Sequence, residues 1–332
     1  MLNLRKRLKL PEKDTSKESS IVVVEAKGGT MNKHCATRKK CYRLFSILAI
    51  VLNISLMSGS VFAQDLKDIK QSGFLRHLGI PYANFVTGSG DGMDIEIIRL
   101  FARHLGVQYQ YVMTDWDNAI GDLTGQKVVP KASDIEVIEI VPIKGDLIAN
   151  GMTVLPWRQK VVTFSNSTFP NQVWLVARSD SPLKPITPSK NTGKDIKAVK
   201  ALIAKRSVLC KTGTCLDPSL YDLQATKAHL EYFEGSLNEI APALLNKKAE
   251  LSLLDVPDAL VALQKWPGKI KVIGPISDIQ DMAVAFRRDS PELVEAFNKF
   301  LEKIKKDGTY RKIADKYYPF AADYYPAFFK ER

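Results

Sequence analysis

The residues best suited to bind a charged small molecule are an arginine, a glycine-bearing turn and an aspartate that stand far apart in the sequence. Thr153 and Arg158 flank a turn in GMTVLPWRQKVVTFS (151–165). A guanidinium group presents a planar pair of N–H donors that matches a carboxylate. The backbone N–H groups of the KTGT turn (211–214) can form an anion nest, and Asp255 can accept hydrogen bonds from an ammonium group. Together these groups fit a free α-amino acid, whose opposite charges lie one carbon apart.

Each of these residues also has a purely structural interpretation. Arg158 could form a surface ion pair, while Thr153 and Asp255 are of types that favour turns and helix N-caps. Asp255 stands two residues before Pro257, as a cap residue would. The sequence leaves both interpretations open.

The elements that must position these residues alternate between short β-branched runs and helical patterns. This alternation predicts an α/β fold with mainly parallel strands. Strands are expected at 74–80, 107–113, 145–154, 173–180, 206–210, 229–233, 250–255 and 270–275. Helices are expected at 93–106, 116–123, 195–205, 236–248, 257–266, from 290 onward and at 305–318. Ligands of open α/β sheets bind at the carboxyl ends of strands, which is where Arg158 and Asp255 are predicted to stand.

Motifs of common enzyme classes are incomplete. TGSGDG (87–92) is placed like a dinucleotide-binding loop, but Met93 occupies the position of the last glycine. The S-x-x-K pattern at 181–184 contains Pro182, which prevents the helix that this motif requires. The histidines beyond the first 63 residues are isolated in the sequence: His77, His104 and His229. We therefore expect no catalytic residue, no metal site and no cofactor.

Charge is distributed unevenly along the 332 residues, whose formal net charge is +12. Residues 1–63 hold 12 Lys and Arg against 4 Asp and Glu, while the remainder holds 36 against 32. The nearly neutral body gives no reason to expect nucleic-acid binding. At roughly 150 residues per domain, the length allows two domains or lobes.

The basic N-terminal segment is typical of a leader. A cationic stretch that ends at Arg43 is followed by an apolar run at 44–57 and by Val61-Phe62-Ala63, which suits a signal peptidase. We expect residues 1–63 to be a leader with the signal peptide at 31–63, and cleavage to release a periplasmic protein. An uncleaved membrane anchor is the alternative, although the apolar run is shorter than the ~20 residues of a span.

Cys210 and Cys215 are the only cysteines beyond the leader. In an oxidising compartment they could form a disulfide, if the turn between them brings their Cα atoms within ~4.4–6.8 Å. Two packed thiols are the alternative, because cysteine is among the most often buried residue types.

Six segments stand in an order that is informative only in combination. They are IPYANF (80–85), GMDIEII (92–98), GDLIANGMTVLPWRQKVVTFS (145–165), the Gly213–Thr214 turn, LLDVPDAL (253–260) and DGTYRKIADKYYP (307–319). This series resembles the amino-acid-type periplasmic solute-binding proteins, solute-binding family 3, from about Phe74 to Tyr318. The resemblance implies two α/β lobes of the type II periplasmic binding protein fold, joined by hinge strands at 173–179 and 271–278. Lobe 1 would comprise 64–175 and 279–332, and lobe 2 would comprise 180–272.

The resemblance also implies roles for individual residues. Arg158 and Thr153 would hold the carboxylate of the ligand, and Thr214 would close on it from lobe 2. The Gly151 carbonyl and Asp255 would take the α-ammonium group. Tyr82 and Trp116 would form aromatic walls around the side chain of the ligand. The alternative is that both are ordinary core residues.

The implied function is the binding of an amino acid or small carboxylate by a monomer that delivers it to an ABC permease in the inner membrane. The alternative is a ligand-sensing or accessory domain for a membrane receptor or a periplasmic enzyme. Related dehydratases carry a catalytic Glu two residues after the turn threonine, where this sequence has Leu216. Related lytic transglycosylases add a catalytic domain, which we do not expect in the few residues after 318. We therefore expect no enzymatic activity.

Three departures from the family pattern affect the site. Cys215 replaces a second threonine of the turn, which removes one hydroxyl. Gly79 stands where binders of basic amino acids carry an acid, so a Lys or Arg ligand would lose that partner. The segment 125–144 is longer than usual and alternates like a strand, which indicates a β-hairpin near the ligand or a surface for a partner.

Overall fold

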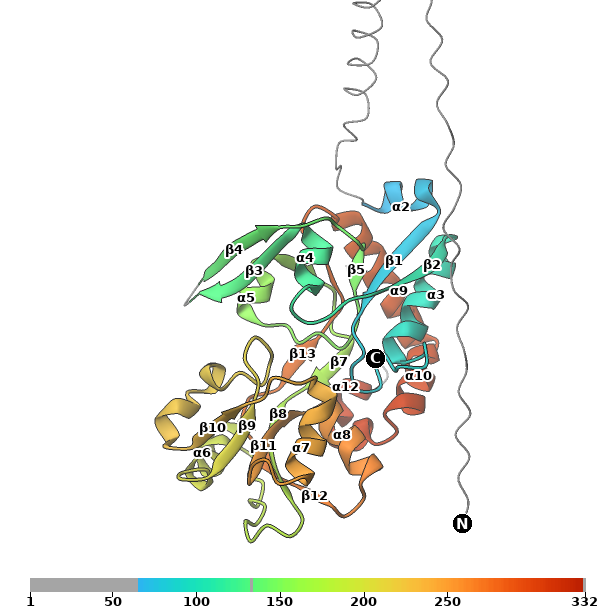
Figure 1. Ribbon diagram of the computed structural model, residues 1–332. Helices are drawn as coiled ribbons and strands as arrows, with labels where there is room; N and C mark the ends of the chain where they lie inside the picture. The colour runs from blue at the N-terminus through green and yellow to red at the C-terminus, as the bar shows by residue number, and fades with distance from the viewer. Residues whose placement is uncertain (1–64, 132–133, 331–332) are drawn as a thin grey trace, which may run out of the picture. The chain divides into compact units, whose positions relative to one another are not determined.

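The computed structural model describes residues 65–131 and 134–330. They form two five-stranded sheets with helices packed on them, as Figure 1 shows. The predicted leader, signal peptide and cleavage site at 1–63 lie outside the described residues. Within the described residues, no helix has the length and apolar character to cross a membrane.

The first sheet has the strand order β2-β1-β5-β14-β6. Its strands are β1 (Phe74–Gly79), β2 (Gln108–Met113), β5 (Leu147–Ile148), β6 (Val162–Phe164) and β14 (Ala285–Arg287). β1 pairs in parallel with β2 and β5, while β14 runs antiparallel to β5 and β6. The strand predicted at 145–154 is therefore only two residues long, because the chain turns immediately afterwards to build the site.

The second sheet has the order β10-β9-β11-β8-β12. Its strands are β8 (Val173–Arg178), β9 (Ser207–Cys210), β10 (His229–Tyr232), β11 (Leu251–Asp255) and β12 (Ile270–Pro275). β9 is parallel to β10 and β11, whereas β8 is antiparallel to β11 and β12. Both sheets are thus mixed rather than mainly parallel, because one strand in each, β14 in the first and β8 in the second, runs against the other four.

Two short strands carry the chain from one sheet to the other. β7 (Phe169–Asn171) precedes β8, and β13 (Gln280–Met282) follows β12; the two pair antiparallel. The predicted hinge strands at 173–179 and 271–278 overlap β8 and β12, which pair within the second sheet, and the position of the hinge remains a prediction. A continuous apolar run marks a buried strand but does not indicate which sheet the strand joins.

Helices cover the faces of both sheets (Figure 1). They are α2 (Leu66–Ser72), α3 (Met93–Leu105), α4 (Ala119–Thr124), α5 (Pro156–Gln159), α6 (Thr192–Leu202), α7 (Ile240–Leu245), α8 (Val256–Lys265), α9 (Pro291–Lys306), α10 (Thr309–Tyr317), α11 (Ala321–Tyr324) and α12 (Pro326–Phe329). Three short 3-10 turns complete the set: η1 (Pro218–Tyr221), η2 (Leu223–Thr226) and η3 (Leu237–Glu239). The apolar stripe of α9 packs on α3, where Phe297 meets Phe101 edge to face. The capping box of Ser236 and Glu239 is confirmed.

The insertion is a β-hairpin, as the alternation predicted. β3 (Gln126–Lys131) pairs antiparallel with β4 (Asp134–Ile140). β3 packs against α4, while most of β4 faces solvent, including Ile138 and Ile140.

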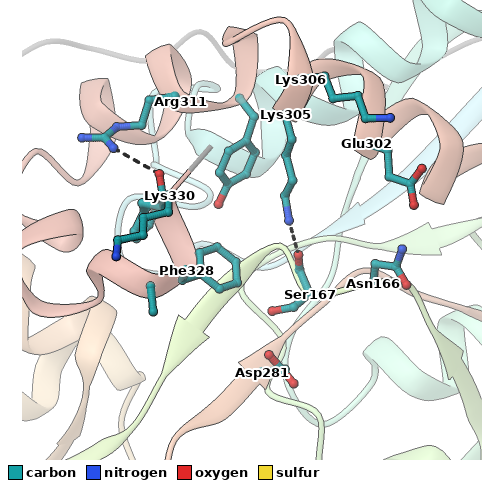
Figure 2. A pocket seen from close by; sticks show the side chains of 12 residues that line it. Asn166, Ser167, Asp281, Glu302, Lys305, Lys306, Arg311, Phe328 and Lys330 are labelled. Atoms are coloured by element: carbon teal, nitrogen blue, oxygen red, sulfur yellow. Dashed lines mark hydrogen bonds between the residues drawn. The ribbon is translucent and has the colours of Figure 1, made fainter. Parts of the chain in front are cut away.

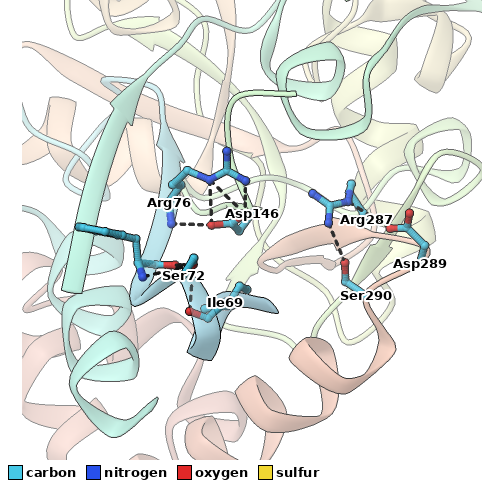
Figure 3. Close-up of polar contacts among 8 residues, drawn as sticks. Ile69, Ser72, Arg76, Asp146, Arg287, Asp289 and Ser290 are labelled. Atoms are coloured by element: carbon cyan, nitrogen blue, oxygen red, sulfur yellow. Dashed lines mark hydrogen bonds and ion pairs between the residues drawn. The ribbon is translucent and has the colours of Figure 1, made fainter. Parts of the chain in front are cut away.

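Ion pairs fix the ends of strands in the first sheet. Asp146, just before β5, is buried and accepts from the backbone N–H of Arg76 in β1 at 2.7 Å and from its Nη2 at 2.6 Å, as Figure 3 shows. Arg287 of β14 donates to Asp289 and Ser290 in the turn before α9. These contacts hold β5 and its following turn in place beside the candidate site.

Candidate ligand-binding site

Arg158 lies in the short helix α5, which follows the turn after β5. Pro156 occupies the first position of α5, where its missing N–H is not needed. The Arg158 side chain is 3% exposed. Its Nη1 donates to the Thr153 carbonyl at 2.9 Å, and its Nη2 donates to the Gly213 carbonyl at 3.3 Å. The arginine therefore contacts the KTGT turn, although the two are 55 residues apart in the sequence.

The Arg158 guanidinium group is a buried cation with unused hydrogen-bonding capacity. Its Nε has no hydrogen-bond partner among the described residues. The rings of Trp116 and Trp157 lie 5.6 and 5.3 Å from the guanidinium carbon. Burial lowers the pKa of Arg158 to about 10, so the group stays charged at neutral pH. The alternative of a surface ion pair is wrong, because the side chain is buried.

Asp255 ends β11 and has two roles at once. Its side chain accepts from the backbone N–H of Asp258 at 3.3 Å, which makes it the N-cap of α8. It also accepts from the Tyr82 hydroxyl at 2.5 Å and from the Cys215 thiol at 3.4 Å. Burial raises the pKa of Asp255. The two interpretations of Asp255 are therefore compatible, because a cap residue at a strand end can still present its carboxylate to the site.

The Tyr82–Asp255 hydrogen bond connects the first-sheet side of the molecule directly to the second-sheet side. Asn238 makes a second connection by accepting from the Ala83 backbone N–H at 2.9 Å. Tyr82 is buried, and the half-buried Trp116 lies edge-to-face with it at 5.6 Å. Both aromatic residues thus pack in or against the core, and their role as walls around a ligand remains a prediction.

The turn after β5 needs glycine at one position. Gly151 has φ +66°, and a Cβ there would lie 2.3 Å from the Phe85 ring. Its N–H donates to the buried Asp94 carboxylate at 2.7 Å, and burial raises the pKa of Asp94 to about 7. The predicted use of the Gly151 carbonyl by a ligand remains a prediction.

Thr153 and Thr214 are both buried, and both hydroxyls have protein partners. The Thr153 hydroxyl accepts from Asn171 Nδ2 at 3.2 Å. The Thr214 hydroxyl donates to the Lys211 carbonyl at 2.9 Å and accepts from the Leu216 N–H at 3.0 Å, which holds the turn in shape. Their contacts to a carboxylate remain predictions.

Cys210 and Cys215 form no disulfide with each other and are free and buried. Their sulfur atoms have different partners, the Glu231 carbonyl at 3.7 Å and the Asp255 carboxylate at 3.4 Å. Burial raises the pKa of both thiols, so neither is a reactive thiolate at neutral pH.

In the part of the chain that the structure describes, no group of three or more His, Cys, Asp and Glu is arranged to hold a metal ion. His77 is fully buried between the Tyr109 hydroxyl at 2.9 Å and the Ala149 carbonyl at 2.6 Å. Burial lowers the pKa of His77 to about 4, which keeps it neutral. Through its contact with the Ala149 carbonyl, this histidine helps to fix the turn after β5.

Sequence reasoning missed three buried polar residues of the site. Asn171 in β7 contacts both Thr153 and the backbone N–H of Val256. The Tyr221 hydroxyl donates to the Cys215 carbonyl at 2.5 Å. Asp258 lies in the first turn of α8, and its Oδ2 is buried with no hydrogen-bond partner among the described residues. Only Asp258 had a signal in the sequence, as a second acid three residues after Asp255.

A cavity of about 730 Å³ lies apart from these residues (Figure 2). Lys305, Arg311, Phe328 and Ser167 are among the residues that line it, next to the start of β7. None of the predicted site residues lines this cavity, so its volume says nothing about the ligand of the Arg158 site.

Residues 140–320 match the model of the bacterial extracellular solute-binding proteins, family 3. This match covers more than half of the chain. The chain belongs to this family. Its fold is the two-lobed type II fold of periplasmic binding proteins, as the sequence predicted.

Family 3 relatives of two kinds are similar to the chain. The membrane-bound lytic murein transglycosylase F of Pseudomonas putida (strain GB-1) is 25% identical over 87% of this chain. The chain covers 54% of that enzyme, so it spans about half the length of the transglycosylases that it matches. The lysine/arginine/ornithine-binding periplasmic protein of Escherichia coli (strain K12) is 23% identical over 83% of this chain and 97% of its own length.

Solved structures of family 3 folds agree with the architecture. The ancestral amino acid-binding protein AncCDT-1, a precursor of cyclohexadienyl dehydratase, has a TM-score of 0.58 and 24% identity, with 76% of this chain and 98% of that chain covered. Holo ArgBP from T. maritima has a TM-score of 0.54 and 24% identity, with 72% and 94% covered. At these identities the structures support the fold and not a particular ligand.

Proposed function

We propose that this family 3 protein binds an α-amino acid or a similar small carboxylate in the periplasm and delivers it to an ABC importer. The observation that carries the proposal is the buried Arg158 cation, whose Nε is unpartnered among the described residues. Arg158 contacts the Gly213 carbonyl, and the Trp116 ring beside it packs edge to face on Tyr82, the partner of Asp255. A ligand with one carboxylate and one ammonium group would complement both parts.

The proposed roles follow from these positions. The ligand carboxylate would take the free N–H of Arg158 and the N–H groups around Thr153 and Thr214. The α-ammonium group would replace the Tyr82 hydroxyl as a donor to Asp255, with help from the Gly151 carbonyl. An ammonium is the stronger donor, because a hydrogen bond between two charged groups is roughly twice as strong as a neutral one.

Binding without catalysis is part of the proposal. Asp217, the acid nearest to the position of the dehydratase Glu, accepts from the Gly213 N–H at 3.2 Å and from the Ser219 N–H at 2.9 Å. It therefore has a structural use in the turn, and Leu216 is buried and apolar.

A ligand-sensing or accessory role is the second candidate. It is supported by the similarity of the chain to about half the length of the lytic transglycosylases. In that case the binding domain would act on a receptor or enzyme instead of a permease. Genes for a permease and an ATPase beside this one would favour transport, and their absence would favour the second candidate.

A thermal-shift screen of the purified protein against amino acids and small carboxylates tests the binding function. A true ligand at a hundredfold excess over its dissociation constant should raise the apparent stability by about 2.7 kcal/mol. If no amino acid and no carboxylate raises the unfolding temperature, the proposed ligand class is wrong.

A further inference from the structure

The candidate site contains more buried acid than an ordinary amino acid needs. Arg158 is its one buried cation among the described residues, whereas Asp255 and Asp258 are both more than nine-tenths buried. An α-amino acid brings one carboxylate for Arg158 and one ammonium group for Asp255. Asp258 is then left without a positive partner.

Asp258 has no task in capping α8, although it stands in the first turn of the helix. The Val256 N–H donates to the Gln172 carbonyl at 3.0 Å, Pro257 has no N–H, and the Asp258 N–H donates to Asp255. The Asp258 carboxylate is therefore not needed to satisfy the backbone donors that open this helix.

Asp258 also differs from Asp255 in its hydrogen bonds. Asp255 accepts from Tyr82 and Cys215, whereas Asp258 shares the Tyr82 hydroxyl and its Oδ2 is buried without a hydrogen-bond partner among the described residues. Burial and the nearby charge of Asp255 raise the pKa of Asp258 well above its ordinary value. Burying a carboxylate without a counter-charge costs free energy, so this group is either protonated or paired with a cation when a ligand binds.

We infer that Asp258 is a specificity-determining ligand contact that selects solutes with a second cationic nitrogen besides the α-ammonium group. This inference rests on the proposed function and adds the class of side chain that the ligand carries. It also places the acid on the second-sheet side of the site. The position of Gly79 cannot supply one, since a Cβ there would lie 2.3 Å from the Tyr111 ring.

Lysine and norleucine form a matched pair of probes, because they differ only in the terminal ammonium group. Calorimetry should show that the wild-type protein binds lysine more tightly than norleucine. Asp258→Asn keeps the size of the side chain and removes its charge. We expect it to weaken lysine binding about 30-fold or more and to change norleucine binding by about threefold or less.

Asp278→Asn is the charge-matched control, because Asp278 is exposed and outside the site. Circular dichroism and thermal unfolding of the empty variants check the fold, with Asp258→Ala as a second variant. The inference is overturned if Asp258→Asn weakens both probes equally, or if the wild type binds neutral amino acids but neither lysine nor ornithine. In both cases the proposed function still stands, whereas the absence of binding by any amino acid removes the function and the inference together.

Discussion

At the scale of the residue, burial affects the cation and the acids of the site differently. Arg158 keeps its charge because its ordinary pKa of 12.5 lies far above neutrality, even when lowered to about 10. Asp255 is buried to the same degree but shares hydrogen bonds with Tyr82 and Cys215. The site therefore holds a permanent positive charge together with carboxyl groups whose charge depends on what they contact.

Arg158→Ala should abolish most of the ligand affinity. Removing one partner of a buried charge pair typically costs about 2–5 kcal/mol, which is roughly 30-fold to several thousandfold in affinity. Arg158→Lys should restore only part of it, because an ammonium group does not reproduce the planar pair of donors. Calorimetry with the ligand from the screen measures both, and wild-type affinity in Arg158→Ala would refute the carboxylate role.

Asp94 should make the stability of the protein depend on pH. Its pKa is about 7 in the folded protein against 3.8 ordinarily, so the folded state holds the proton more tightly than the unfolded state. The stabilising effect of this proton is complete below pH 3.8. As the pH rises from there to about 7, the effect is lost and the free energy of unfolding falls by roughly 4 kcal/mol at most.

Asp94→Asn should flatten that pH dependence, since an amide oxygen can still accept from the Gly151 N–H but does not ionise. Denaturant unfolding between pH 4 and pH 8 would measure the free energy of unfolding of both proteins. An unchanged slope in the variant would show that Asp94 is not the titrating group.

At the scale of the element, α9 shows how local periodicity becomes tertiary packing. Its apolar stripe is buried against Phe101 of α3 and Phe286 of β14, while Glu295 and Lys299 on the other face form an exposed ion pair. Phe297 is fully buried at the centre of this contact. The helix thereby ties the C-terminal part of the chain to the first sheet.

Phe297→Ala should lower the free energy of unfolding by about 3–5 kcal/mol, because it leaves a cavity among aromatic rings. Glu295→Ala on the exposed face should leave the free energy of unfolding nearly unchanged, because exposed ion pairs contribute little. Chemical denaturation measures both, and equal effects would mean that α9 does not bury its apolar stripe.

At the scale of the whole molecule, the Tyr82–Asp255 and Arg158–Gly213 contacts join the two sides of the site. Such contacts can be exchanged for contacts with a ligand only if the two sides separate first. We propose that the two sides of the site move about the two crossing strands, β7 and β13.

We expect the ligand-free protein in solution to sample forms in which the two sides are apart, so that ligand binding makes it more compact on average. Small-angle scattering of the purified protein, with and without the ligand from the screen, would report a smaller radius of gyration in the complex. An unchanged radius at saturating ligand would contradict a hinged closure.

The predicted export and cleavage of the leader can be tested on the full-length protein. We expect N-terminal sequencing of the exported product to begin at Gln64, because the basic stretch, apolar run and Val61-Phe62-Ala63 occur in the order that a signal peptidase recognises. A membrane-bound product that retains residues 44–57 would contradict this expectation.

The sequence by itself determined the features that depend on neighbouring residues. Helical spacing predicted α3 and α9, strand alternation predicted the β3–β4 hairpin, and residue chemistry singled out Arg158 and Asp255. These features could be predicted because helix periodicity and side-chain charge are local properties of the chain. The family resemblance rested on short motifs of the same local kind.

Only the tertiary structure decided the features that depend on distant residues meeting. It brought the Tyr82 hydroxyl to Asp255 across 173 positions, placed the crossing strands at β7 and β13, and kept Cys210 and Cys215 apart as free thiols. It also left Oδ2 of Asp258 buried without a hydrogen-bond partner among the described residues. Packing and hydrogen-bond satisfaction are sums over the whole fold, so no local pattern indicates which polar group remains available for a ligand.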